Sequence, residues 1–162
     1  MGFVKRLLSA IDAATGIVAS VFMAVMIVNV ALGVFTRYVL QDSLPWSEEL
    51  GRYLMVWCGF LGCGIAMMED GHVGVTMVLD LLAPEARKLV LLLGRTVMAV
   101  FLAVVFVKSL SLLNTLSIQK SSAMEIPMAI PYASVTVGMA LMFVGNIRKM
   151  AQLALKPARE SK

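Results

Sequence analysis

PWSEELGRYLMVWCGFLGCGIAMMEDGH, residues 45–72, decides the fold class of this chain. Its first helical turn contains Glu48 and Glu49, where the positive end of a helix dipole favours carboxylates. Residues 53–68 carry no charge, and the apolar run then ends in two acidic residues. The stretch therefore predicts a membrane-spanning helix over 46–68, with ionic side chains at one rim and an acidic stop at the other.

The rim of this helix carries both charged and aromatic side chains. Arg52 follows Glu48 by four residues and Glu49 by three, so on a helix its guanidinium can reach either carboxylate. Trp46 suits the level of the lipid headgroups, whereas Trp57 is too deep for that level and is expected to pack against protein. We interpret these residues either as a contact surface for another protein or as a local cap and ion pair worth about 0.5 kcal/mol.

The rest of the chain extends the membrane pattern. Hydrophobic residues make up 60% of it and charged residues 15%, whereas a soluble domain is closer to half apolar and a quarter charged. Three further apolar runs, 13–36, 89–113 and 126–147, are each long enough to cross a bilayer of about 30 Å. We predict an all-α membrane protein, with residues 1–162 forming a single domain of four transmembrane helices.

Two shorter segments complete this prediction. Residues 72–82 are too short to span a bilayer, and His72, Thr76 and Asp80 recur every four positions on one face. This pattern favours a short amphipathic helix lying in the membrane surface between the second and third spans. Residues 148–162 are expected to form a frayed basic tail.

The second span contains a stripe of small residues. Gly59, Gly62, Cys63 and Ala66 follow the i, i+3, i+4, i+7 spacing of one helix face. Small residues let another membrane helix approach closely, so the stripe predicts helix packing. The partner is either another helix of this chain or a separate subunit, and the sequence does not choose between them.

Three polar residues lie inside the predicted spans. Asn29 favours a hydrogen bond between two helices over a contact with substrate. Arg95 and Lys108 are candidates for function because ionisable groups within a membrane are costly. Snorkelling to a rim, or pairing with a neighbouring carboxylate, is the competing interpretation of both.

The basic residues predict the orientation. Those near the two ends and the middle connection are Lys5, Arg6, Arg87, Lys88, Arg148, Lys149, Lys156, Arg159 and Lys162, and those near the other two connections are Arg37, Arg52, Lys108 and Lys120. Because cytoplasmic loops carry the excess of Lys and Arg, both termini are expected in the cytoplasm.

The sequence lacks the residue patterns that most catalytic and cofactor-binding functions require. The single histidine and two cysteines do not form a metal or haem motif, and no nucleophile with its base is apparent. No cluster of basic and aromatic residues suggests nucleic acid. We therefore predict neither enzyme activity nor a cofactor, and favour a membrane subunit that works with partners.

Several segments together suggest a family. They are Arg37-Tyr38, Pro45-Trp46-Ser47-Glu48-Glu49, Arg52, Tyr53, Trp57, Phe60-Leu61-Gly62, Ala66, His72-Val73, Ile126-Pro127, Ile130-Pro131-Tyr132 and Gly138. From Arg6 to about Lys149, the chain resembles the small membrane subunit, of the DctQ type, of tripartite ATP-independent periplasmic (TRAP) transporters.

The resemblance implies a static scaffold for a much larger permease subunit in the bacterial inner membrane. It also implies that a periplasmic solute-binding protein delivers organic acids such as carboxylates, whose uptake is driven by an ion gradient. The candidate residues for contact with these partners are Arg37, Trp46, Glu48, Glu49, Arg52 and Trp57. The alternative is a self-contained homo-oligomeric carrier or channel, with Asn29, Arg95 and Lys108 facing its pore.

Overall fold

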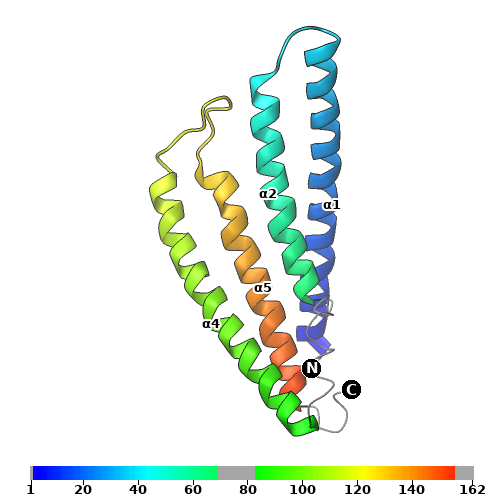
Figure 1. Cartoon of the computed structure of the whole chain (residues 1–162), viewed down its shortest axis with the longest axis vertical. Helices are drawn as coiled ribbons and strands as arrows, with labels where there is room; N and C mark the ends of the chain where they lie inside the picture. The colour runs from blue at the N-terminus through cyan, green and yellow to red at the C-terminus, as the bar shows by residue number, and fades with distance from the viewer. Residues whose placement is uncertain (1, 69–82, 156–162) are drawn as a thin grey trace.

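The computed structural model describes residues 2–68 and 83–155, which form four helices (Figure 1). These are α1 (Gly2–Tyr38), α2 (Pro45–Met68), α4 (Pro84–Leu116) and α5 (Ala129–Leu155). Each is long and apolar enough to cross a membrane, which confirms the predicted all-α membrane fold. The predicted interfacial helix at 72–82 lies outside the described residues.

The helices extend beyond the predicted spans at several ends. Helix α1 begins at Gly2, because the charged residues that end the apolar run do not interrupt the helix. Helix α5 continues to Leu155, so residues 148–155 are helical and the prediction of a frayed tail is wrong for them. The same helix begins at Ala129 rather than at 126, since the residues before it belong to a turn.

That turn joins α4 to α5 and has hydrogen bonds of its own. The backbone N–H of Ser121 donates to Ile126 at 2.9 Å, and that of Met128 donates to Gln119 at 2.8 Å. Glu125 has a left-handed φ of 52°, a conformation that side chains other than glycine rarely adopt. Residues 126–128 therefore pair across the turn instead of entering the helix.

The four helices lie side by side in the order α1, α2, α5, α4 (Figure 1). Helices α1 and α4 form the two edges of this row, and they expose apolar side chains such as Val28 (68% exposed) and Val97 (70% exposed). Such broad apolar surfaces suit contact with lipid tails or with another membrane protein. The fold is an open row and not a closed bundle.

Small residues hold the two central helices close together. A Cβ atom added at Gly138 would lie 2.7 Å from Cβ of Phe60, and one added at Gly64 would lie 3.1 Å from Cβ of Leu141. Distances below 3.0 Å are not compatible with an undisturbed interface. The α2–α5 contact thus depends on glycines outside the stripe singled out in the sequence.

An ion pair links helices that are not neighbours in the row. Nη1 of Arg148, on α5, lies 3.0 Å from Oδ2 of Asp12, on α1. Both side chains are about one-third exposed. This contact joins the edge helix α1 to α5 near the first residues of α1 and the last residues of α5.

Candidate functional site

The candidate site is the polar rim at which α1 ends and α2 begins, opposite the end where α1 begins and α5 ends (Figure 1). We call Arg37, Glu48, Glu49 and Arg52 the ionic collar. The first of these lies in the last turn of α1, and the other three lie on the first two turns of α2. The contacts that each of these side chains makes within the chain determine whether it is available to bind another molecule.

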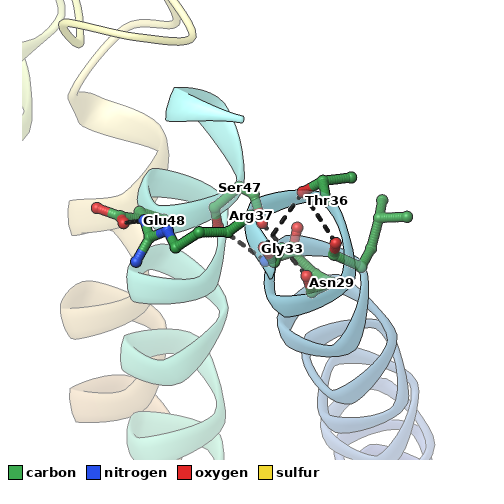
Figure 2. A network of polar contacts seen from close by, with 7 residues as sticks. Asn29, Gly33, Thr36, Arg37, Ser47 and Glu48 are labelled. Carbon is green, nitrogen blue, oxygen red and sulfur yellow. Dashed lines mark hydrogen bonds and ion pairs between the residues drawn. The ribbon is translucent and has the colours of Figure 1, made fainter. Parts of the chain in front are cut away.

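Beneath the collar, Asn29 and Ser47 join α1 to α2 (Figure 2). Nδ2 of Asn29 donates to the carbonyl of Ser47 at 2.8 Å, and Oγ of Ser47 donates to the carbonyl of Asn29 at 3.2 Å. Both residues are buried. This confirms the predicted helix–helix hydrogen bond, and it places the Asn29 amide between helices of the same chain.

At the surface of the collar, the Arg37 guanidinium donates to Oε1 of Glu48 (Figure 2). The two side chains are 52% and 62% exposed, so solvent and salt weaken their attraction. The pair links the end of α1 to the start of α2, and it remains accessible from outside.

Glu49 is turned inward and holds the α4–α5 turn. The residue is only 6% exposed, and its Oε1 accepts the hydroxyl hydrogen of Tyr53. Its Oε2 accepts the backbone N–H groups of Ala123, at 2.8 Å, and Met124, at 3.1 Å. Three donors therefore compensate the buried carboxylate, as burial of a charge requires.

Arg52 corrects the prediction made from helix spacing. It forms no ion pair with Glu48 or Glu49 in the described parts of the chain. Arg37 takes the first carboxylate, and the donors of the turn take the second. The exposed Arg52 side chain lies instead between two cavities on either side of α2.

One cavity, of about 610 Å³, lies between α1 and α2 and is bordered by Asn29, Ser47 and Met55. The other, of about 340 Å³, lies between α2 and α5 and is bordered by Tyr53, Tyr132 and Val135. Arg52 contributes to the wall of both.

The two tryptophans have different surroundings. Trp57 meets Phe22 of α1 edge to face, with ring centroids 5.7 Å apart at 84°, so the prediction that it packs against protein is confirmed. Trp46 is 38% exposed at the start of α2. Only Trp46 therefore presents its ring at the rim.

Comparison with known families now decides the class of the chain. The family described as "Tripartite ATP-independent periplasmic transporters, DctQ component" matches residues 26–156. The chain belongs to this family. Its membership, together with four apolar helices, makes it a multi-pass protein of the inner membrane.

Three relatives illustrate the range of this DctQ family. The sialic acid TRAP transporter small permease protein SiaQ of Vibrio cholerae is 34% identical over 83 residues, 51% of this chain and 48% of SiaQ. The C4-dicarboxylate TRAP transporter small permease protein DctQ of Rhodobacter capsulatus is 26% identical over 102 residues, 62% of this chain and 45% of that protein. The chain thus spans about half the length of each of these small permeases.

A third relative is larger. The isethionate TRAP transporter permease protein DctMQ of Oleidesulfovibrio alaskensis is 25% identical over 108 residues. The match covers 65% of this chain but 17% of DctMQ. A region similar to this DctQ-family chain therefore occurs within a much longer permease polypeptide.

The small-residue stripe of the DctQ-family chain faces away from its own helices. Gly59, Gly62, Cys63 and Ala66 are all exposed. A Cβ atom added at Gly59 or Gly62 would meet nothing within 4 Å. In the residues that the structure describes, no other helix packs against Gly59 or Gly62.

Arg95 packs against α5. The carbonyl of Arg95 accepts from Nδ2 of Asn146 at 2.9 Å, and its Nη1 lies 3.4 Å from Oδ1 of the same amide. Asn146 is fully buried. It was not among the residues predicted from the sequence, although, like Asn29, it is a single amide in an apolar run. Lys108 is exposed on α4.

Metal binding has no visible basis in residues 2–68 and 83–155. No group of three His, Cys, Asp or Glu side chains there is arranged to hold an ion.

Proposed function

We propose that this chain is the small membrane subunit of a TRAP-type secondary transporter and serves as a static scaffold for the large permease subunit. The observation that carries the proposal is the exposed stripe on α2, a central helix of the row, in a chain whose family is the DctQ component. Asn29 and Arg95 support it as well, because each makes a contact between helices of the same chain, Asn29 through its side-chain amide and Arg95 through its backbone carbonyl.

The stripe is the proposed contact for a helix of the large subunit. Small residues allow the close backbone approach that membrane helices need in place of a hydrophobic driving force. The length of DctMQ supports such a partner, since a region like this chain is there part of one permease polypeptide.

We further propose organic acids as the transported solutes. The relatives are named as components of transporters for sialic acid, isethionate and C4-dicarboxylate. All of these solutes are organic anions. Solute binding would take place in the large subunit, with uptake driven by an ion gradient.

The exposed Arg37–Glu48 pair is the proposed contact with a periplasmic solute-binding protein. This role requires the collar to face the periplasm and both termini to lie in the cytoplasm. Labelling of a Ser43→Cys variant, in a background where Cys58 and Cys63 are replaced by serine, tests the orientation. Modification by an impermeant reagent added to intact spheroplasts supports it, and protection of this cysteine contradicts it.

Reconstitution tests the scaffold role directly. The chain alone, the large subunit alone and the pair are placed in liposomes with an inward ion gradient, the binding protein and a radiolabelled organic acid. The proposal expects uptake only from the pair. Uptake by this chain alone would establish the alternative of a self-contained carrier.

A matched pair of variants tests the stripe. Gly62→Leu, on α2, and Gly94→Leu, on α4, both add bulk where nothing lies within 4 Å of a new Cβ atom. Each variant should leave the fold of the chain unchanged. The proposal expects Gly62→Leu alone to reduce co-purification of the large subunit at least tenfold, and equal recovery from both variants would contradict it.

A further inference from the structure

The smaller cavity at the rim has the chemical character of a site for an amphiphile. It lies between the first two turns of α2 and the beginning of α5, and its volume is about 340 Å³. This is within the range of about 300–1,000 Å³ that is typical of small-molecule sites. Glu49, Arg52 and Tyr53 border it from α2, and Tyr132 borders it from α5.

Among the residues that the structure describes, Arg52 has no ion-pair partner. The nearest carboxylate groups along the helix are already engaged, Glu48 by Arg37 and Glu49 by three hydrogen-bond donors. Throughout the described residues no other carboxylate forms an ion pair with Arg52. The guanidinium therefore keeps its full capacity to bind an anion.

The depth of Arg52 makes an uncompensated charge costly. It lies seven residues after Pro45, the first residue of α2, which is about 10 Å along the helix axis at 1.5 Å per residue. If Pro45 lies at the level of the headgroups, that depth is close to the boundary between the headgroups and the hydrocarbon core, where arginine extends toward the headgroups. Lipid phosphate is the abundant anion at that boundary.

Below the guanidinium the cavity wall becomes apolar. Both α2 and α5 run from this rim into the membrane, so Val56 and Val135 lie one turn deeper than Arg52 and Tyr132. Both valines line the cavity. The cavity thus offers a cation with aromatic neighbours at its mouth and a branched aliphatic surface beneath.

We infer that this cavity binds an anionic phospholipid, with the phosphate held by Arg52 and an acyl chain lying along Val56 and Val135. The order of the lining, charged at the rim and aliphatic toward the membrane centre, matches the two parts of such a lipid. A carboxylate from a partner protein would satisfy the charge but would leave the aliphatic part of the cavity unfilled. The lipid site goes beyond the scaffold role and does not depend on it.

Co-purified lipid provides the first test. The full chain is purified in a non-ionic detergent, as wild type and as Arg52→Gln, Arg52→Lys and Lys120→Gln. Lys120 is an exposed cation in the neighbouring turn and does not border the cavity, so it controls for general charge. Quantitative mass spectrometry should show at least a tenfold loss of bound phosphatidylglycerol in Arg52→Gln, partial retention in Arg52→Lys and no change in Lys120→Gln.

Titration of delipidated protein separates the possible ligands. Phosphatidylglycerol should bind at least tenfold more tightly than glycerol 3-phosphate, which has the anion without acyl chains. Val135→Trp, which fills the apolar part of the cavity and keeps Arg52, should lower the affinity for the lipid and leave that for glycerol 3-phosphate unchanged.

Three results would overturn the inference. The first is equal lipid content in the wild type and Arg52→Gln. The second is equal affinity for the lipid and for glycerol 3-phosphate. The third is a cross-link from a photoreactive residue at position 122, which borders the cavity and leaves Arg52 in place, to an acidic segment of the large subunit, with no lipid recovered. This result would assign the guanidinium to a protein partner.

Discussion

Asn29 and Ser47, on adjacent helices, exchange two hydrogen bonds through side chain and backbone, at 2.8 Å and 3.2 Å. Two glycines allow this close contact. A Cβ atom added at Gly33 would lie 2.7 Å from Oγ of Ser47, and one added at Gly51 would lie 3.3 Å from Nδ2 of Asn29. The start of α2 is thus fixed against α1 by short residues and polar contacts, directly beneath the ionic collar.

Replacing Asn29 by alanine should weaken the α1–α2 contact. The variant removes the donor to the Ser47 carbonyl, and hydrogen bonds between membrane helices contribute about 1 kcal/mol. Reversible unfolding in mixed micelles should show a loss of that size. Asn114→Ala, at an exposed position of α4, is the control, and an equal loss in both variants would mean that the buried bond contributes nothing specific.

Glu49→Ala should release the α4–α5 turn. The carboxylate accepts from the backbone of Ala123 and Met124, and hydrogen bonds to a charged group contribute about 1.5–3 kcal/mol. Hydrogen exchange at these two amides should accelerate by about tenfold to hundredfold. Glu48→Ala removes an exposed carboxylate one residue away and should leave both amides protected. Unchanged exchange in Glu49→Ala would show that the turn is stable without it.

The four spans were predictable because each is a long apolar run with charges at its ends, and length alone identifies such helices. The order of the helices in the row was not predictable. It depends on where small residues such as Gly138 and Gly145 meet Phe60 and Met67, and a glycine on an apolar helix has no pattern that distinguishes a buried position from an exposed one.

The residues of the ionic collar were predicted from the sequence, but most of their contacts were not. Helix spacing correctly put Glu48, Glu49 and Arg52 on the first turns of α2, but it assigned the wrong partners. Two of the three donors to Glu49 come from a turn 74 and 75 residues later in the chain, and Arg37 reaches Glu48 across a helix connection. Local spacing contains no information about contacts made at such separations.

Gly138→Ala should disrupt the centre of the row, whereas Gly59→Ala should not. The new methyl group at position 138 would lie 2.7 Å from Cβ and 3.1 Å from the carbonyl oxygen of Phe60, and overpacking of this kind costs about 1–3 kcal/mol. Gly59 has open space around it. Thermal denaturation of the detergent-solubilised chain should separate the two variants. Equal stability would show that α2 and α5 can move apart without cost.

Asn146→Ala should destabilise the contact between α4 and α5. Asn146 is fully buried and donates to the carbonyl of Arg95, so the variant loses a buried hydrogen bond and leaves a small cavity. The expected loss of about 1–3 kcal/mol is measurable by unfolding in mixed micelles. Asn114→Ala serves again as the exposed control, and equal losses would remove the structural role assigned to the buried amide.

Arg95→Met then distinguishes a structural from a transport role for this arginine. The Asn146 side chain donates to the backbone of Arg95, and methionine at position 95 keeps that acceptor. The guanidinium contact of 3.4 Å is long for a hydrogen bond, so its loss should cost less than about 1 kcal/mol. Uptake by the assembled transporter should therefore be unchanged. A large fall in uptake with normal assembly would instead place Arg95 on a path for solute or ions, because its packing role alone cannot account for that result.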